Sequence, residues 1–221
     1  MKLGTNTIAS LKIGSTDISE VRLGSVLVWS AFTYDADALA YFAVNSAITS
    51  DADKLAIDAF YKGLKADGIY TKIRALYIPI WSSAVNNKWN LVDPRDLDAA
   101  YRLVFNGGWS FSSGGATPNG TNAFADTYLN NNIMAQNSLH ISAWSRTNQD
   151  SVTTLLSSWN SGFGTSIYPR SGGDIYCHNN STTTGVHSSP EGTIGFFLNS
   201  RVNSTQILIQ RSSSQNTKNV T

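Results

Sequence analysis

The stretch Lys88–Thr127, KWNLVDPRDLDAAYRLVFNGGWSFSSGGATPNGTNAFADT, marks the point where the chain changes character. Residues 32–102 carry 17 charged side chains, whereas residues 107–200 carry six, namely Asp126, Arg146, Asp150, Arg170, Asp174 and Glu191. The second half is rich in Ser, Thr, Asn and Gly with isolated aromatic residues, which is typical of β domains with many turns. We therefore predict helices before this stretch and an all-β domain after it.

The stretch itself contains two turn signals. Arg102–Phe105 alternates and favours a strand, and Asn106-Gly107-Gly108 follows it as a turn in which positive φ is easily adopted. We expect Trp109–Ser112 to return as the partner strand. Pro118-Asn119-Gly120 predicts the next turn.

The β half contains short segments of β-branched and aromatic residues between turn residues. The predicted strands are Tyr101–Asn106, Trp109–Ser112, Ala123–Leu129, Leu139–Arg146, Val152–Trp159, Ser166–Pro169, Ile175–His178, Thr193–Asn199 and Gln206–Arg211. Many short strands with Gly, Ser and Asn turns predict a β-sandwich of the jelly-roll type. In Leu139–Arg146, alternation places Leu139, Ile141 and Ala143 on one face.

The tail Ser212–Thr221, SSSQNTKNVT, is polar and has no apolar pattern. Either the sandwich is small, or the sequence is a fragment of a longer one. We favour the fragment.

The middle of the chain predicts helices. A helix opens at Tyr34–Asp37, and Ser50 is the expected N-cap of a second helix in which acidic residues occupy the first turn. Leu55, Ala56, Ala59, Phe60 and Leu64 are expected to form its buried face, with Gly68 at its C-terminal end. A third helix is expected at Ile69–Leu76.

The first thirty residues contain an internal repeat. Lys2-Leu3-Gly4-Thr5, Lys12-Ile13-Gly14-Ser15 and Arg22-Leu23-Gly24-Ser25 recur every ten residues. Each unit reads as two short strands around a turn, which predicts a small meander or β-roll. So few residues bury little surface alone, so we favour a docking module completed by other subunits over the first hairpins of one continuous domain.

Composition excludes several classes of protein. The formal net charge is +1 without a basic stripe, which gives no indication of nucleic acid as a partner. A single cysteine, Cys177, excludes an intramolecular disulfide framework and is interpreted as a core residue. No long apolar run or signal-peptide pattern is present, so no membrane insertion is expected. The aspartates at Asp35–Asp37 and Asp51–Asp53 are interpreted as helix caps, and no metal or cofactor is predicted.

Several segments of the sequence resemble those of a known protein family. Asp93–Thr127 (DPRDLDAAYRLVFNGGWSFSSGGATPNGTNAFADT), Asn137–Arg146 (NSLHISAWSR) and Gly195–Arg201 (GFFLNSR), together with the N-terminal repeat, resemble virion structural proteins of phages that infect Bacteroidetes. These are fibre, spike or adhesin-like proteins with a domain similar to concanavalin A-like, laminin-G-like sandwiches. The resemblance implies a virion location, with other virion proteins as partners. We also expect a symmetric homo-oligomer, with a trimer favoured, because further copies of the chain would close the small repeat module and multiply weak sugar contacts.

No catalytic motif is present, so we predict that the chain is not an enzyme. Surface recognition of sugars remains, because an aromatic ring can stack on a sugar while polar groups bond its hydroxyls. The turn-rich piece Asn160–Asn180 is the first place to expect it, since binding residues concentrate in loops. The candidate ligand-binding residues are Trp144, Trp159, Tyr168, Arg170, Asp174 and Tyr176, with Trp109 and Asn160 as further candidates.

The sequence thus predicts three parts: a β-repeat attachment module (1–31), a helical connector (32–90) and a lectin-like β-sandwich (91–221). The expected function is a tail or head fibre or spike component that anchors by its repeat and adheres to host-surface glycans. Two alternatives stay open: a virion decoration without a ligand, and a polysaccharide depolymerase with two carboxylates ~5–9 Å apart across a groove.

Overall fold

The structure is a computed structural model, and it describes residues 2–3, 6–7, 10–18, 20–30, 33–148, 154–160, 162–171, 174–188, 192–211 and 214–219. These residues are mainly β with a short helical segment, as the sequence predicts. The chain divides into two compact units: Met1–Tyr77 with Trp89–Asp96, and Ile78–Lys88 with Leu97–Thr221. The segment 78–96 is thus shared between the units, and the boundary expected at residue 90 lies within it.

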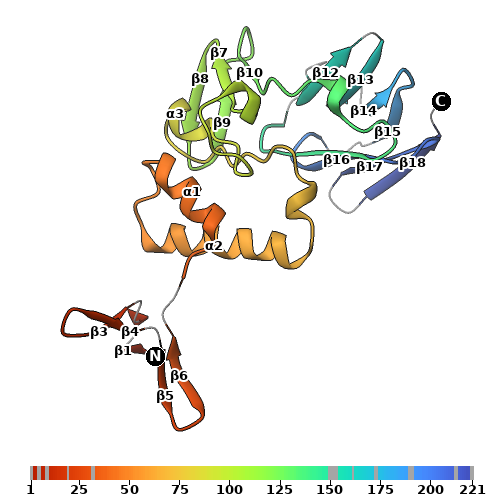
Figure 1. Cartoon of the computed structure of the whole chain (residues 1–221). Coiled ribbons are helices and arrows are strands. Elements are labelled where there is room, and N and C mark those ends of the chain that lie inside the picture. Colours follow the sequence, from red (N-terminus) through yellow and green to blue (C-terminus); the bar gives the residue numbers. More distant parts are fainter. Residues whose placement is uncertain are drawn as a thin grey trace. The chain divides into compact units, whose positions relative to one another are not determined.

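The N-terminal repeat folds as three separate antiparallel hairpins (Figure 1). Their strands are β1 (Lys2–Leu3), β2 (Asn6–Thr7), β3 (Leu11–Ile13), β4 (Thr16–Ile18), β5 (Glu20–Leu23) and β6 (Val26–Ser30). Gly14 and Gly24 adopt φ of +62° and +63° in the turns of the second and third hairpins, a conformation that glycine adopts without strain. Ile13 and Leu23, which precede these turns, are 75% and 77% exposed. Each ten-residue repeat is therefore one hairpin, and the second and third hairpins leave apolar side chains in solvent.

Both predicted helix starts are confirmed. In α1 (Ala36–Val44), the side chain of Asp35 caps the helix by accepting from the backbone N–H of Asp37 at 2.9 Å. In α2 (Asp51–Ala66), the Ser50 hydroxyl accepts from the N–H of Asp53 at 3.0 Å. Gly68, with φ of +67°, ends α2 as predicted, because its N–H and that of the next residue bond back to the last turn.

The buried face of α2 differs from the prediction. Leu55 and Phe60 are 43% and 39% exposed, while Asp58 and Tyr61 are buried. Asp58 accepts from the backbone N–H of Asp35 and pairs with Lys62 at 2.8 Å, and the Tyr61 hydroxyl donates to the carbonyl of Leu91 at 2.6 Å. Hydrogen bonds that bind distant segments together therefore select the buried face, which apolar periodicity alone does not reveal.

The third predicted helix is wrong. Only a 3-10 turn, η1 (Tyr70–Lys72), forms there, and the chain then runs extended. The side chain of Asn90 explains this, because it accepts from the N–H of Leu76 at 3.0 Å and donates to the carbonyl of Arg74 at 3.1 Å. The remaining helical pieces before the β half are α3 (Ala84–Asn87) and η2 (Asp98–Ala100).

The stretch Lys88–Thr127, where the composition of the chain changes, forms two small sheets. Their strands are β7 (Val104–Asn106), β8 (Trp109–Ser112), β9 (Gly115–Pro118) and β10 (Phe124–Asp126). The expected pairing of β7 with β8 is wrong, because β7 pairs with β10 and β8 with β9. The turn after Pro118 explains the difference: Asn119 Oδ1 accepts from the N–H groups of Thr121, Asn122 and Ala123, which turns β10 back alongside β7.

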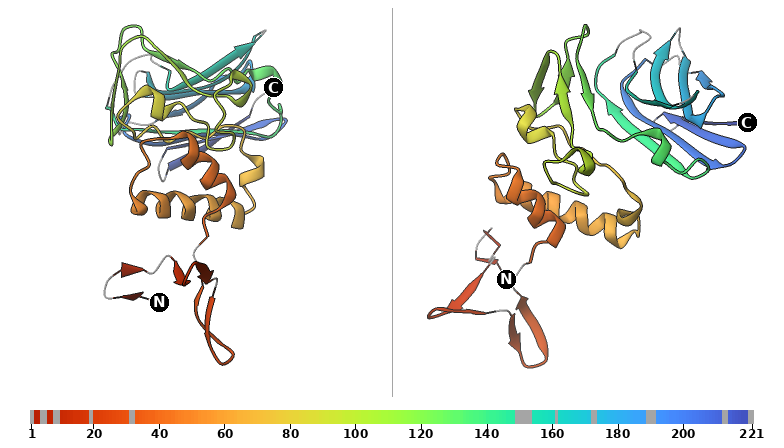
Figure 2. Two further views of the ribbon diagram at one scale, coloured as in Figure 1. Left: turned by 60° about the vertical axis from the view of Figure 1, so that its left-hand side comes forward. Right: turned by 45° about the horizontal axis from the view of Figure 1, so that its top comes forward.

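The C-terminal residues form the predicted β-sandwich, seen as two layers in Figure 2. After η3 (Asn131–Ile133), its strands are β11 (Leu139–Ser145), β12 (Leu156–Asn160), β13 (Phe163–Ser171), β14 (Asp174–Ser181), β15 (Gly185–Ser188), β16 (Gly195–Asn203), β17 (Gln206–Arg211) and β18 (Ser214–Asn219). One four-stranded sheet, the β12–β15 sheet, has the order β12-β13-β14-β15, and the other, the β16 sheet, has the order β11-β16-β17-β18.

Two features of the sandwich differ from the prediction. The β12–β15 sheet is a meander of strands that are consecutive in sequence. In the β16 sheet, however, β11 pairs with β16, and the four strands of the other sheet lie between these two along the chain. This order differs from that of the expected jelly roll. The polar tail also contributes a strand, since β18 pairs with β17 along its whole length. An edge strand buries little, so it needs no apolar pattern.

The apolar core lies between the two sheets. Its fully buried members are Ile167, Ile175 and Cys177 from the β12–β15 sheet and Phe197, Ile207 and Ile209 from the β16 sheet. Ile141 packs against them, so the face of β11 predicted to carry Leu139, Ile141 and Ala143 is the one that turns toward the core. Burial raises the pKa of the Cys177 thiol to about 12, and the residue is a core side chain as the sequence indicates.

A buried polar bridge joins the two sheets beside this core. The side-chain amide of Asn199 on β16 donates to the carbonyls of Ser166 and His178, at 3.2 and 2.6 Å, on the opposite sheet. In the reverse direction, Asn179 on β14 donates to the Asn199 side-chain oxygen at 3.2 Å. Both asparagines are fully buried, so these bonds form away from water and fix how the sheets face each other.

Replacing Asn199 by leucine keeps the branched shape of the side chain and removes the bridge. Because the Asn179 amide and two carbonyls then lose a buried partner, we expect Asn199→Leu to lower the free energy of unfolding by about 1–3 kcal/mol. Urea unfolding followed by tryptophan fluorescence measures it. An unchanged midpoint would show that the bridge does not stabilise the sandwich.

Candidate functional site

Strict alternation along β14 separates a core face from an outer face. Ile175, Cys177 and Asn179 are buried, whereas Asp174, Tyr176 and His178 are half-buried on the side that points away from the core. On the neighbouring strand β13, Tyr168 lies directly opposite Tyr176, and Ser166 lies opposite His178. The outer side of the β12–β15 sheet therefore carries aromatic side chains; we call Trp159, Tyr168, Tyr176 and His178 together the aromatic face.

Trp159 on β12 is the most exposed member of the aromatic face, at 49%. Its indole lies over Gly164 of the paired strand, because a Cβ atom at Gly164 would come within 2.6 Å of the ring carbons. The imidazole of His178 packs edge-on against the indole with 4.7 Å between ring centroids. A glycine below and a histidine beside it thus hold the ring in place while part of it stays open to solvent.

His178 is itself fixed from both ring nitrogens. The Ser166 hydroxyl lies 3.1 Å from Nδ1, and the Thr184 hydroxyl lies 2.9 Å from Nε2. Burial lowers the pKa of His178 because the charged imidazolium is poorly solvated there. A ring bonded by two hydroxyls is held in place and supports the indole of Trp159.

The structure brings five of the six predicted site residues onto strands of one sheet, and four of them onto its outer side. Trp159, Tyr168 and Tyr176 belong to the aromatic face, and the alternation of β14 places Asp174 on the same side. Arg170 lies in β13 beside a register shift, and its side chain is outside the described residues.

Trp144 belongs elsewhere. It lies on β11 of the β16 sheet, opposite Phe196, and is 64% exposed. Trp109, a further candidate, is a packing residue: its indole stacks with Phe111, contacts Phe105, and donates to the carbonyl of Asn106 at 2.9 Å.

The residues that support the site are not evident from sequence patterns. Gly164 and His178 are not identifiable as neighbours of Trp159, because strand register is not visible in a composition rich in Ser, Thr and Asn. A pocket lined by several asparagines near η3 was also not predicted, although the runs Asn130–Asn132 and Asn179–Asn180 are visible in the sequence.

No cluster of three or more metal-binding side chains occurs among the described residues. None of the helices in that part of the chain is both long and apolar enough to span a bilayer. Comparison of the chain with protein-family models, with curated proteins and with solved structures finds no match.

The pKa values of the histidines predict how stability depends on pH. Burial lowers the pKa of His178 and of His140 from 6.5, so just below that pH the unfolded state binds more protons than the folded state. The free energy of unfolding therefore falls as the pH drops through this range. We expect His178→Gln to reduce the fall, and His140→Gln to remove a further part. Urea unfolding at about pH 7.5 and about pH 5.5 measures it. Equal falls in the wild type and both variants would contradict this assignment.

Proposed function

We propose that the chain is a structural protein of a phage virion, a tail or head fibre or spike component that adheres to glycans on the host surface. In this proposal the N-terminal hairpins attach the chain to the particle, and the sandwich displays the aromatic face as a non-enzymatic binding surface. Its partners are other virion proteins, further copies of itself and host glycans, without nucleic acid or membrane insertion.

The observation that carries the adhesive part is the support of Trp159. An indole held over Gly164 and against His178 is rigid, yet it is half exposed. Rigid, amphipathic rings bind sugar faces well because little side-chain entropy is lost on binding. Tyr168 and Tyr176 extend the surface along the sheet, and their hydroxyls with the Asp174 carboxylate supply polar groups for sugar hydroxyls.

The observation that supports attachment is the isolation of the N-terminal hairpins. Each is a two-stranded sheet, and such a unit is only marginally stable alone. Ile13, Leu23 and Val26 are exposed around their turns and would be buried against neighbouring chains. A symmetric homo-oligomer, with a trimer favoured, would supply such neighbours and would multiply weak sugar contacts.

The virion location rests on the sequence resemblance to structural proteins of phages that infect Bacteroidetes. That resemblance includes Gly195–Arg201, which forms most of β16, and Asn137–Arg146, which contains β11. The sequence segments that carry the resemblance therefore include two of the four strands of one sheet of the sandwich. A virion protein of this kind needs an anchor and a displayed domain, and the chain offers a separate candidate for each.

Glycan adhesion is tested with the full chain on immobilised bacterial surface polysaccharides. We expect Trp159→Ala to weaken binding roughly tenfold or more, as is typical of a central tryptophan in a binding surface. Gly164→Ala should weaken it too, because the new methyl group displaces the indole without removing it.

The matched control is Trp144→Ala, which removes an equally large and more exposed indole from the other sheet. Equal losses for Trp144→Ala and Trp159→Ala would contradict a specific role for the aromatic face. Absence of binding by the wild-type chain to every polysaccharide would contradict adhesion and favour a decoration without a ligand.

The virion location is tested separately by immunogold electron microscopy of purified particles, with an antibody raised against residues 100–221. We expect label at one defined place on the particle, because an adhesive domain must be displayed outside. Protein in infected-cell lysate without label on intact particles would contradict the displayed adhesin.

A further inference from the structure

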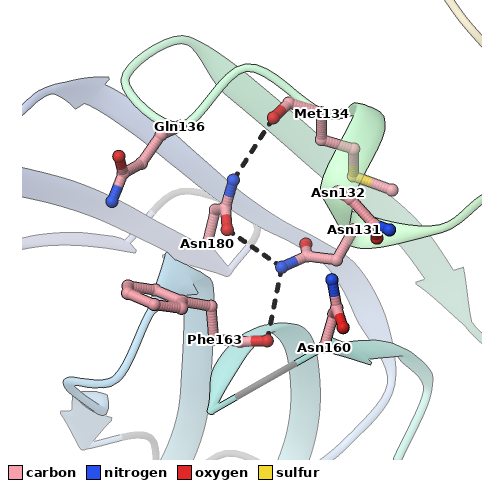
Figure 3. A pocket seen from close by; sticks show the side chains of 7 residues that line it. All are labelled: Asn131, Asn132, Met134, Gln136, Asn160, Phe163 and Asn180. Atoms are coloured by element: carbon pink, nitrogen blue, oxygen red, sulfur yellow. Dashed lines mark hydrogen bonds between the residues drawn. The ribbon is translucent and has the colours of Figure 1, made fainter.

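A pocket of about 310 Å³ lies beside η3, where the chain enters the sandwich (Figure 3). Its lining residues are Asn131, Asn132, Met134, Gln136, Asn160, Phe163 and Asn180. Five of the seven side chains are carboxamides, two are apolar, and none is charged. None of them belongs to the aromatic face, so the pocket is a separate feature of the same sandwich.

The floor of the pocket is built in advance by a closed set of hydrogen bonds. Asn131 is buried, and its amide donates to the Asn180 side-chain oxygen at 2.9 Å and to the carbonyl of Phe163 at 3.3 Å. The Thr165 hydroxyl donates to Asn131 and accepts from the backbone N–H of Asn180. Asn180 adopts φ of +48° and donates its amide to the carbonyl of Met134. The floor therefore needs no rearrangement before a ligand enters.

The rim offers groups that are not used by the fold. The side chains of Asn132 and Gln136 are exposed, and their carboxamides make no hydrogen bond to any residue that the structure describes. The Phe163 ring is partly exposed, and in the view of Figure 3 it lies on the same side of Asn180 as Gln136. An incoming ligand would thus meet free donors and acceptors together with one apolar surface.

This combination fits a neutral sugar. A carboxamide both donates and accepts, which matches a hydroxyl group, and the aromatic ring suits the apolar face of a pyranose. A charged ligand would lose its hydration without gaining a counter-ion from this lining. The volume lies at the lower end of the roughly 300–1,000 Å³ typical of ligand pockets, which favours one sugar ring over an oligosaccharide.

We propose that this pocket binds a single uncharged sugar residue, in addition to the glycan contact of the aromatic face. The ligand class rests on the proposed function, whereas the site, its size and its selectivity against charge rest on the pocket alone. Asn132 and Gln136 bond the hydroxyls, Phe163 contacts the ring of the sugar, and Asn131 and Asn180 position these groups from below.

The test uses the ¹⁵N-labelled full chain and free monosaccharides: glucose, galactose, mannose and N-acetylglucosamine, with glucuronate as the charged counterpart. We expect at least one neutral sugar to shift the side-chain amide signals of Asn132 and Gln136, and glucuronate not to. Asn132→Ala and Gln136→Ala should each weaken that binding roughly threefold to tenfold, the usual effect of one hydrogen bond. Both residues are exposed, so the variants are expected to fold.

A matched control separates the side chains of this site from other exposed asparagines. Asn219→Ala removes an exposed asparagine from β18 and should leave the shifts of the Asn132 and Gln136 signals unchanged. If no neutral sugar shifts the signals while polysaccharide binding still depends on Trp159, the pocket proposal fails and the proposed function stands. Equal binding of glucuronate, or an equal loss of sugar binding in Asn219→Ala, would also overturn the pocket proposal. If neither sugars nor polysaccharides bind, both proposals fail.

Discussion

The buried guanidinium of Arg201 is the constraint on which the sandwich depends. It donates to the carbonyls of Asn203 and Ser204 in its own hairpin and reaches across to those of Asn179 and Asn180 on the other sheet. A buried charge is tolerated only when fixed dipoles replace its hydration, so all these carbonyls must be held in place together. The β16–β17 hairpin and the end of β14 are thereby locked to each other.

This lock links the core to both candidate sites. Asn180, whose carbonyl lies 3.5 Å from Arg201, adopts a left-handed conformation and forms the floor of the asparagine-lined pocket. Earlier in the same strand, alternation sends Cys177 into the core and His178 outward against Trp159. The strand β14 therefore contributes to the core, to the aromatic face and to the asparagine-lined pocket. Its two faces are chemically distinct because the side chains of a pleated strand point alternately to the core and to solvent. Binding surfaces on such a strand inherit the rigidity of the core.

Sequence patterns were reliable where the physics is local. Ser50 and Gly68 mark the ends of α2 because caps depend on neighbouring backbone groups, and Ile207 and Ile209 mark β17 by alternation. Patterns failed where distant groups decide. The side chain of Asn90 keeps residues 74–76 extended by hydrogen-bonding to their backbone. Asp58 and Tyr61 lie on the buried face of α2 because they bond to backbone groups far away in sequence. For the candidate site, the sequence identified the aromatic residues but not their partners. Trp144 and Trp159 look alike in sequence, and only strand order assigns them to different sheets.

The position of Cys177, the single cysteine of the chain, makes its thiol a probe of local unfolding. Cys177 is fully buried among the isoleucines of the core, and burial raises its pKa to about 12. The thiolate is the nucleophile that reacts with thiol reagents, and this buried sulfur meets them only when the two sheets separate. The rate at which Cys177 is labelled therefore reports how often the sandwich opens, independently of the helices and the N-terminal hairpins. The molecule thus contains its own probe of local unfolding in the half that carries both candidate binding sites.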